Sequence, residues 1–392
     1  MTRLKIAFVV DRFGNRYGGA EAYGVALVRE LSKWHDVTVF ARDYDTSCDV
    51  QLTYVPLNSW KRWPSWIRVL IMAFRVRRMT RQGYDIVHSH CNGWAGHIEV
   101  VHVTPVRYNW RVRALPRVKR ILSYVSLRVQ SYLWLEARRV KPRQAHHVVA
   151  VSSLIARQLQ DAYGPGLNMS VIPPGVYVPA ADTPGQRLQT RTQLGFTEKD
   201  LVCILVARNP QRKGLKTILQ ALTQLPDHVQ ALVVGCDPAT ERLICAMPEF
   251  QNLEHRVKLV PVTSDVTPYY RAADICVHPT SNDSFGMAPL EAMSCGLPVI
   301  VSPEPWCGFA AYLKDGHDAL LLKAPDDARH LAQSIARLEA DPDLRLRLCQ
   351  AAVNVVNSYA WSQIVLRYLE LYNDVLNQDS PEVLADQQIP TS

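Results

Sequence analysis

A pair of acidic residues, Asp283 and Glu291, is the feature of this sequence that points most directly to chemistry. Asp283 lies in a polar loop after the apolar run 274–278, and Glu291 lies in a helix-like run that begins after Gly286. The start of such a helix offers free N–H groups and a positive dipole end, which suit a phosphate or another anion. A carboxylate further along can accept hydrogen bonds from sugar hydroxyls. The alternative is an ordinary turn with two solvated acids.

A basic turn supplies the complementary charge. Arg208 and Lys213 stand five positions apart in a turn between the apolar run 201–207 and a helix-like run. Two cations beside a helix N-terminus can neutralise a diphosphate, although a solvated basic turn explains the same residues. Open α/β sheets bind ligands at the carboxyl ends of their strands, which is where both this turn and the acidic loop are expected.

The N-terminal half holds further candidates. Gly18 and Gly19 lie in the turn after the first apolar run, where paired glycines permit close approach of the backbone to a ligand. Their spacing departs from the GxGxxG fingerprint of dinucleotide-binding folds, so a plain flexible turn is the alternative. Three histidines, His88, His90 and His102, lie near the carboxyl ends of two strand-like runs. One such histidine is more often structural, but three favour a histidine that faces the ligand.

The elements that must position these residues alternate along the chain. Strand-like runs alternate with helix-like runs first over residues 4–175 and again over residues 201–340. This alternation is typical of doubly wound parallel sheets. We therefore predict an α/β fold with two Rossmann-like domains facing a central cleft.

Composition sets the domain boundaries. Residues 175–200 are rich in Pro, Thr, Gln and charge, and we interpret them as a linker or hinge. We predict an N-terminal domain over 1–174 and a C-terminal domain over 175–360. A C-terminal helix over 361–377 is expected to pack back on the N-terminal domain, and the polar tail 378–392 is predicted to be disordered.

Length, cysteine usage and hydropathy limit the class of protein. At about 150 residues per domain, 392 residues predict two domains. The nine cysteines are scattered without CxxC spacing, which argues against a disulfide framework or a zinc site and favours a reducing cytosol. The sequence shows neither a signal peptide nor an apolar run of the roughly 18 residues that span a bilayer. We therefore expect a cytoplasmic protein.

Positive charge is concentrated in the first part of the chain. The net charge is +8, yet residues 1–143 carry 25 Lys and Arg against 10 Asp and Glu. Two runs, 59–81 and 107–143, mix basic with aromatic residues, among them Trp60, Lys61 and Phe74 in the first. Such helices are typical of membrane-surface elements, here on the inner face of the cell membrane. The alternatives are surface helices with a solvated basic face, or nucleic-acid binding, for which no recognisable module is present.

Taken together, these motifs resemble the retaining GT-B glycosyltransferases of family four. The resemblance rests on Arg208 with Lys213-Gly214, on the Asp283 and Glu291 pair, on Ser152, and on the run 171–175. It spans nearly the whole chain, since Gly18-Gly19-Ala20-Glu21 matches the N-terminal glycine loop of the family and Asp315-Gly316 matches its late turn.

The resemblance implies roles for individual residues of the second half. Arg208 and Lys213 would hold the donor diphosphate and offset charge on the departing nucleotide. Glu291 would accept hydrogen bonds from the ribose hydroxyls. Asp283 would face the donor sugar, with Phe285 and Gly286 nearby. The family has glutamate where this chain has Asp283, and the shorter side chain puts donor choice or that role in question.

In the first half, the resemblance implies that His102 lies near the reacting sugar. Gly18 and Gly19 would approach the phosphates or the acceptor. We expect no cofactor and no metal, because cations on a preorganised turn can stabilise the leaving group. Two DxD triplets, Asp43-Tyr44-Asp45 and Asp341-Pro342-Asp343, are interpreted as chance occurrences.

The predicted function is transfer of a hexosyl-type sugar, with retention, from a nucleotide-sugar donor to a glycan or lipid-linked acceptor (EC 2.4). Cell-surface polysaccharide or lipopolysaccharide assembly is the expected setting, with peripheral binding to an anionic membrane surface and no nucleic-acid partner. The alternatives are a nucleotide-sugar epimerase of the same fold and, in a different class, an anionic-surface or nucleic-acid binding protein. The missing GxGxxG disfavours an NAD oxidoreductase.

Overall fold

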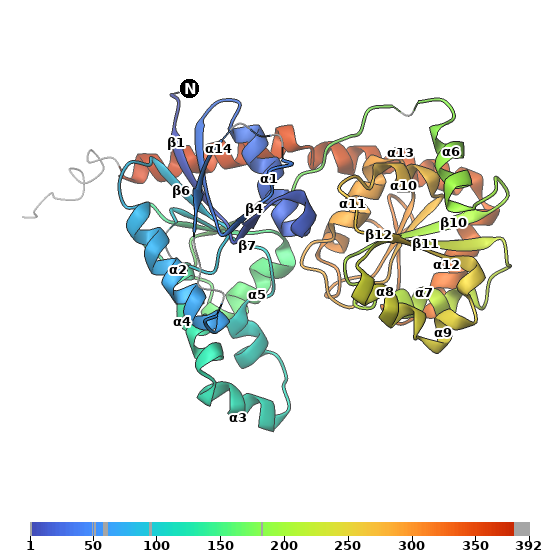
Figure 1. Ribbon diagram of the computed structural model, residues 1–392, viewed down its shortest axis with the longest axis horizontal. Helices are drawn as coiled ribbons and strands as arrows, with labels where there is room; N and C mark the ends of the chain where they lie inside the picture. The colour runs from blue at the N-terminus through green and yellow to red at the C-terminus, as the bar shows by residue number, and fades with distance from the viewer. Residues whose placement is uncertain are drawn as a thin grey trace, which may run out of the picture. The chain divides into compact units, whose positions relative to one another are not determined.

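The computed structural model describes residues 2–48, 50, 52–57, 62–93, 96–181 and 183–379. The chain divides into two compact units (Figure 1). The first unit combines residues 1–175 with the segment that starts at Trp361, and the second unit is Val176–Ala360. Trp60 and Lys61 of the first basic run, and positions 380–392 of the predicted tail, lie outside the described residues.

A parallel sheet forms the centre of the first unit. Its described strands follow the order β5-β3-β1-β6-β7-β8-β9, and every pairing between neighbours is parallel. The strands are β1 (Lys5–Val9), β3 (Asp36–Ala41), β5 (Thr53–Pro56), β6 (Ile86–Ser89), β7 (Ile98–Val101), β8 (His147–Ala150) and β9 (Met169–Val171). A separate short pair joins β2 (Arg12–Phe13) to β4 (Asp43–Tyr44).

Helices cover both faces of this sheet. Successive side chains of a strand point to opposite faces, and here apolar side chains are buried on both faces. Along β1, Ile6 and Phe8 belong to one buried cluster, and Ala7 and Val9 belong to another on the opposite face. The helices are α1 (Gly19–Leu31), α2 (Ser65–Met79), α3 (Arg117–Val125), α4 (Leu127–Val140) and α5 (Ser153–Tyr163), with single turns η1 (Asn15–Tyr17) and η2 (Tyr108–Val112).

The last helix, α14 (Trp361–Asp379), packs in the first unit although the second unit precedes it in the chain. Its buried face, including Tyr368 and Tyr372, joins the main core of the first unit. Trp361 fits against the backbone of Gly175, where a Cβ atom would lie 2.6 Å from the indole ring. The helix runs two residues further than the predicted bound of 377.

The second unit contains a parallel sheet in the order β12-β11-β10-β13-β14-β15 within the described residues. Its strands are β10 (Leu201–Val206), β11 (Val229–Cys236), β12 (Val257–Pro261), β13 (Ile275–His278), β14 (Val299–Val301) and β15 (Leu320–Leu321). Cys203 and Leu205 of β10 face one buried cluster, and Val202 and Ile204 face the other. The sheet is therefore buried on both faces, as parallel sheets are.

The helices of the second unit divide between these two clusters. Side chains of α7 (Leu215–Leu222), α8 (Pro238–Cys245), α9 (Pro248–Gln251) and α12 (Ala328–Ala340) pack on one face, and those of α10 (Thr267–Ala272) and α11 (Met287–Ser294) pack on the other. Short turns are η3 (Glu254–Arg256) and η4 (Gly308–Tyr312), and α13 (Pro342–Ser358) contributes to both clusters.

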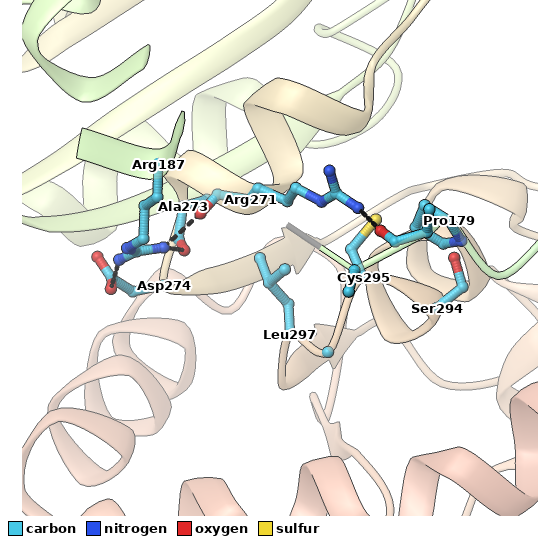
Figure 2. A pocket seen from close by; sticks show the side chains of 11 residues that line it. Pro179, Arg187, Arg271, Ala273, Asp274, Ser294, Cys295 and Leu297 are labelled. Atoms are coloured by element: carbon cyan, nitrogen blue, oxygen red, sulfur yellow. Dashed lines mark hydrogen bonds and ion pairs between the residues drawn. The ribbon is translucent and has the colours of Figure 1, made fainter. Parts of the chain in front are cut away.

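The predicted linker 175–200 contains a helix, α6 (Gln186–Leu194), so the linker prediction is wrong over that stretch. Arg187 and Arg191 of α6 both pair with Asp274 at the start of β13, at 2.6 and 3.2 Å. Figure 2 shows the first of these pairs, between Arg187 and Asp274. Arg191 is buried and also donates to the carbonyl oxygens of Thr197 and Ala272. Guanidinium hydrogen bonds fasten this helix, which explains why its sequence lacks an apolar stripe.

Figure 2 also shows a hollow beside this clamp, lined by Pro179, Arg271, Ser294 and Cys295 among others. It lies at the amino end of β13, away from the carboxyl ends of the strands. The guanidinium of Arg271 donates to the carbonyl oxygen of Ala180. Both arginines of this hollow are thus engaged by the protein itself.

Two further sequence expectations can be compared with the structure. The triplet 341–343 begins α13, where Asp341 caps the helix by accepting the N–H of Leu344 at 2.8 Å. In the other triplet, Asp45 accepts the N–H and hydroxyl of Ser47 at 3.2 and 2.8 Å. Among the described residues, no helix combines the length and apolar character needed to cross a bilayer.

Candidate functional site

Two loops meet at the carboxyl edge of the second unit's sheet. One follows β10 and carries Arg208 and Lys213, and the other follows the adjacent strand β13 and carries Asp283. The N–H and hydroxyl of Ser281 both donate to the carbonyl oxygen of Arg212, at 3.2 and 3.1 Å. These bonds fasten the basic turn to the acidic loop. The sequence prediction that both lie at strand carboxyl ends is confirmed.

Gly214 makes this close approach possible. Its φ is +91°, a conformation that L side chains rarely adopt, and a Cβ atom there would lie 2.1 Å from the carbonyl oxygen of Pro279. Only glycine satisfies both conditions without displacing the neighbouring loop. Lys213, the preceding residue, is thereby held against the loop that contains Asp283.

The carboxylate of Asp283 is the centre of a charged cluster. Its Oδ2 atom lies 2.5 Å from Nζ of Lys213 and 2.9 Å from Nε2 of His278. Burial alone would raise the pKa of Asp283, but the hydrogen bond from His278 and the charge of Lys213 outweigh it and hold that pKa well below its usual range. Burial lowers the pKa of His278, with Asp283 opposing. At neutral pH the aspartate is therefore ionised beside a cation and a neutral imidazole.

Hydrogen bonds to a third segment shape the acidic loop. The N–H of Asp283 donates to the carbonyl oxygen of Trp306 at 2.7 Å, and the N–H of Gly308 donates to the carbonyl oxygen of Asp283 at 3.0 Å. Gly286 has φ +113°, and a Cβ atom there would lie 2.8 Å from Sγ of Cys307. Glycine is therefore required where the loop turns into α11.

The structure places the side chain of Phe285 in the core. This ring is 4% exposed and packs on Phe309, with ring centroids 5.1 Å apart, and on Tyr359. The sequence-based expectation that Phe285 contacts a ligand therefore does not hold for its side chain. The buried ring of Phe285 instead anchors the loop between Asp283 and Gly286 to the core.

Glu291 lies on α11, half-buried, with Oε2 accepting a hydrogen bond from the hydroxyl of Tyr270 at 3.0 Å. Burial raises the pKa of Glu291, and the hydrogen bond from Tyr270 opposes that rise. The tyrosine hydroxyl also lies 3.1 Å from the carbonyl oxygen of Ala288. Tyr270 thus orients the carboxylate from a neighbouring helix, a role that nothing in the sequence indicated.

Arg208 is exposed at the start of the turn that ends in Lys213. The prediction that Arg208 and Lys213 share one turn is therefore confirmed. The sequence analysis did not single out His278, which contacts Asp283. A signal for His278 was available, because this residue ends β13 only five positions before Asp283.

The first unit places its candidates around a row of rings at the ends of β6 and β7. Nε2 of His102 lies 2.7 Å from Nδ1 of His90, and Nε2 of His90 lies 3.0 Å from Nε2 of His88. Nδ1 of His88 lies 2.5 Å from the hydroxyl of Tyr372 on α14. We call these four residues the histidine row. The structure brings the three histidines into one hydrogen-bonded row, while the expectation that one of them faces a ligand stays a prediction. Tyr372 is a member of the row that the sequence did not indicate.

Gly18 and Gly19 open α1 in the same unit. Gly18 precedes the helix with φ +149°, and a Cβ atom added to Gly19 would meet nothing within 4 Å. One turn further along α1, the ring of Tyr23 packs on His102 with centroids 5.1 Å apart. Helix α1 therefore begins at the two glycines and contacts His102 through Tyr23, one turn later.

Two sequence models of glycosyltransferase families match this chain. The sequence model of "Glycosyltransferase Family 4" matches residues 17–178, and that of "Glycosyl transferases group 1" matches residues 186–355. A D-inositol 3-phosphate glycosyltransferase from Geodermatophilus obscurus is 28% identical over 306 residues, which is 72% of this chain and 64% of the relative. The chain thus spans less than two thirds of the length of that protein.

Solved structures share the fold. WaaG, a glycosyltransferase involved in lipopolysaccharide biosynthesis, superposes with a TM-score of 0.77 at 18% identity, covering 94% of this chain and 99% of WaaG. Anabaena Alr3699/HepE in complex with UDP-glucose gives a TM-score of 0.75 at 18% identity, covering 95% of this chain and all of that one. At these identities the likeness supports the GT-B fold alone, with its two Rossmann-like sheets.

Proposed function

The chain belongs to the group 1 glycosyltransferases, and on this premise we propose that it transfers a hexosyl sugar from a nucleotide-sugar donor to a glycan or lipid-linked acceptor with retention. The observation that carries the proposal is the charged cluster of Lys213, Asp283 and His278 at the carboxyl edge of the second sheet. Glu291, oriented by Tyr270, lies on the helix that follows this loop.

Each group has a task in this reaction. The leaving nucleoside diphosphate gains negative charge as the glycosidic bond breaks, and preorganised cations stabilise that charge without reorganising at the moment of reaction. Lys213, held in place by Asp283, and Arg208 on the same turn would supply this stabilisation. Glu291 would accept hydrogen bonds from the ribose hydroxyls. Asp283 would act mainly by positioning Lys213, because two protein groups already engage its Oδ2 atom.

The substrate class is inferred from relatives and from charge. The names of the similar proteins include a D-inositol 3-phosphate glycosyltransferase, a lipopolysaccharide glycosyltransferase and a complex with UDP-glucose. These names support a nucleotide-sugar donor and a membrane-associated or phosphorylated acceptor. We assign the protein to assembly of a cell-surface polysaccharide or lipopolysaccharide.

A panel of nucleotide sugars tests the assignment. Each is incubated with the protein, and the release of nucleoside diphosphate and the anomeric configuration of the transferred or hydrolysed sugar are followed by NMR. We expect one donor to release its diphosphate and to give a product of unchanged anomeric configuration. Interconversion of the nucleotide sugar without diphosphate release would indicate an epimerase instead, and the absence of turnover for every donor would contradict the proposal.

The anionic membrane surface is the second part of the proposal, and α3 is its main support. Figure 1 shows this helix standing away from the sheet of its unit. Its apolar side chains Val118, Ile121 and Val125 are 68%, 66% and 73% exposed. Exposed basic residues alternate with them, and these are Arg117, Lys119 and Arg120. An exposed apolar ridge with interleaved cations suits the interface of an anionic bilayer.

Vesicle flotation tests this surface. A variant with Arg117, Lys119 and Arg120 changed to Gln is compared with wild type on phosphatidylglycerol and on phosphatidylcholine vesicles. We expect wild type to float with the anionic vesicles and the α3 variant to lose most of that binding. A parallel variant without the exposed charges of Arg75, Arg77 and Arg78 on α2 measures the share of the first basic run. Equal flotation of wild type and the α3 variant would contradict the proposal.

A further inference from the structure

The histidine row lies among uncharged rings and is fully buried at the end formed by His88 and Tyr372. His88 and Tyr372 are fully buried, and Phe8 packs on both His88 and His90. Tyr23 and Tyr368 complete the enclosure, and their hydroxyls bond to each other rather than to a histidine. A charged imidazole in such surroundings would lack a compensating anion.

The protonation states follow from this burial. Burial lowers the pKa of His88 and of His102 to about 3, and it lowers the pKa of His90 well below its usual value. The positive charge of Arg139, on α4, lowers the pKa values of His90 and His102 further. All three imidazoles are therefore neutral at physiological pH, and each carries one N–H donor and one acceptor nitrogen.

The hydroxyl of Tyr372 fixes the direction of the hydrogen bonds. Among the described residues, its partner is Nδ1 of His88. If Tyr372 accepted this bond, its buried O–H would have no acceptor among the described residues, and an unsatisfied buried donor is costly. If Tyr372 donates, the same single bond satisfies its O–H. Tyr372 therefore donates to Nδ1 of His88. The proton of His88 must then lie on Nε2, which donates to Nε2 of His90.

The same reasoning continues to the other end of the row. His90 accepts at Nε2, so its proton lies on Nδ1 and is donated to Nε2 of His102. His102 accepts at Nε2, so its own proton lies on Nδ1. His102 is half-buried, and among the described residues its Nδ1 has no protein partner.

We propose that Tyr372, His88 and His90 are positioning residues that hold His102 in the Nδ1–H tautomer, so that it presents a hydrogen-bond donor to a substrate oxygen. The donation to a substrate oxygen rests on the proposed transferase function, whereas the tautomer of His102 does not. A neutral imidazole with its proton on Nδ1 cannot accept a proton through that atom. His102 therefore donates to a sugar or phosphate oxygen and does not act as a general base there.

The experiment uses two matched variants on one helix. Tyr372→Phe removes the donor that begins the row. Tyr368→Phe makes the same change at another fully buried tyrosine of α14, whose hydroxyl bonds to Tyr23 instead. The full-length protein is labelled with ¹⁵N-histidine, the His102 signals are assigned by their loss in His102→Gln, and thermal unfolding verifies that each variant folds.

In wild type and in Tyr368→Phe we expect a protonated-type shift for Nδ1 of His102 and an unprotonated-type shift for Nε2. In Tyr372→Phe we expect both shifts to move toward intermediate values, with kcat on the best nucleotide sugar reduced about tenfold, the equivalent of one net hydrogen bond. A wild-type His102 protonated on Nε2 would overturn the proposal without any variant. The expected tautomer with unchanged kcat in Tyr372→Phe would overturn the positioning role. If wild type turns over no nucleotide sugar, the proposed function fails while the tautomer is still measured.

Discussion

The two units share one architecture, but the candidate residues are neutral in the first unit and charged in the second. Each has a parallel sheet whose strand ends carry its candidate residues. In the first unit those residues form the histidine row, which is neutral and surrounded by rings. In the second unit the corresponding edge holds an ionised aspartate between a lysine and a histidine. The fold therefore fixes where functional side chains lie, and the residues around each edge decide whether they act as dipoles or as charges.

This difference predicts different costs of mutation. A neutral hydrogen bond contributes about 0.5–1.5 kcal/mol net. Removal of one partner from an ion pair costs up to about 3–5 kcal/mol when the pair is fully buried, because the other charge is left uncompensated, and less for the partly exposed pair of Lys213 and Asp283. Substitutions in the charged cluster and its supports should therefore have larger effects than substitutions in the histidine row.

The largest stability effect is expected at Gly214. In Gly214→Ala the new methyl group would overlap the carbonyl oxygen of Pro279 at a φ of +91°, and the combined strain and overlap should cost about 3 kcal/mol or more. Gly195→Ala is the control, because Gly195 has φ +84° with nothing within 4 Å, so about 1 kcal/mol is expected there. Urea unfolding measures both. Equal losses would show that the two loops do not need this close approach.

A loss of enzyme activity is expected for the variant Glu291→Ala. Removal of this carboxylate should reduce kcat/KM about 10²-fold, on the scale of other lost transition-state contacts. Glu339→Ala is the control: it removes a half-buried glutamate of α12 that pairs with His228, and it should leave turnover unchanged. A near-normal rate for Glu291→Ala in a folded protein would exclude this helix from the donor site.

A smaller effect, dependent on pH, is expected for Asp283→Asn. The pKa of Asp283 is held far below its ordinary value of 3.8, so its ionised form stabilises the folded state at pH values above about 4. That contribution declines as pH falls below the unfolded-state value, because the unfolded chain then binds the proton first. Urea unfolding should show wild type more stable by about 1–3 kcal/mol at pH 7, with the gap narrowing toward pH 3.5. A gap that is constant with pH would contradict the ion pair.

Much of the second unit could be predicted from sequence because its signals are local. Lys213, Gly214 and Asp283 lie in the short loops that follow two apolar runs, so the strand-loop-helix pattern places them at one edge. The ion pair between Lys213 and Asp283 could not be predicted, since it depends on a carbonyl of Pro279 that only glycine can approach.

The missed features depend on contacts that are distant in sequence. Tyr372 lies 284 positions from His88, and no periodicity relates the two. The segment of α6 looks like a linker in the sequence because arginines in a polar segment are normally solvated, whereas Arg187 and Arg191 fix this helix by pairing with Asp274. The position of Phe285 in the motif places it near the donor, but its burial depends on Phe309 and Tyr359, which are distant in sequence.

Lys213, held by Asp283, is proposed to bind the diphosphate of the donor. Calorimetric titration of UDP, ADP and GDP into wild type, Lys213→Ala and Lys216→Ala tests it most directly, since Lys216 is a nearby exposed lysine that pairs with Glu249. We predict that at least one nucleotide binds to wild type and to Lys216→Ala with similar affinity, and at least tenfold more weakly to Lys213→Ala. Equal affinity in all three proteins, or loss in Lys216→Ala alone, would show that Lys213 does not bind the diphosphate.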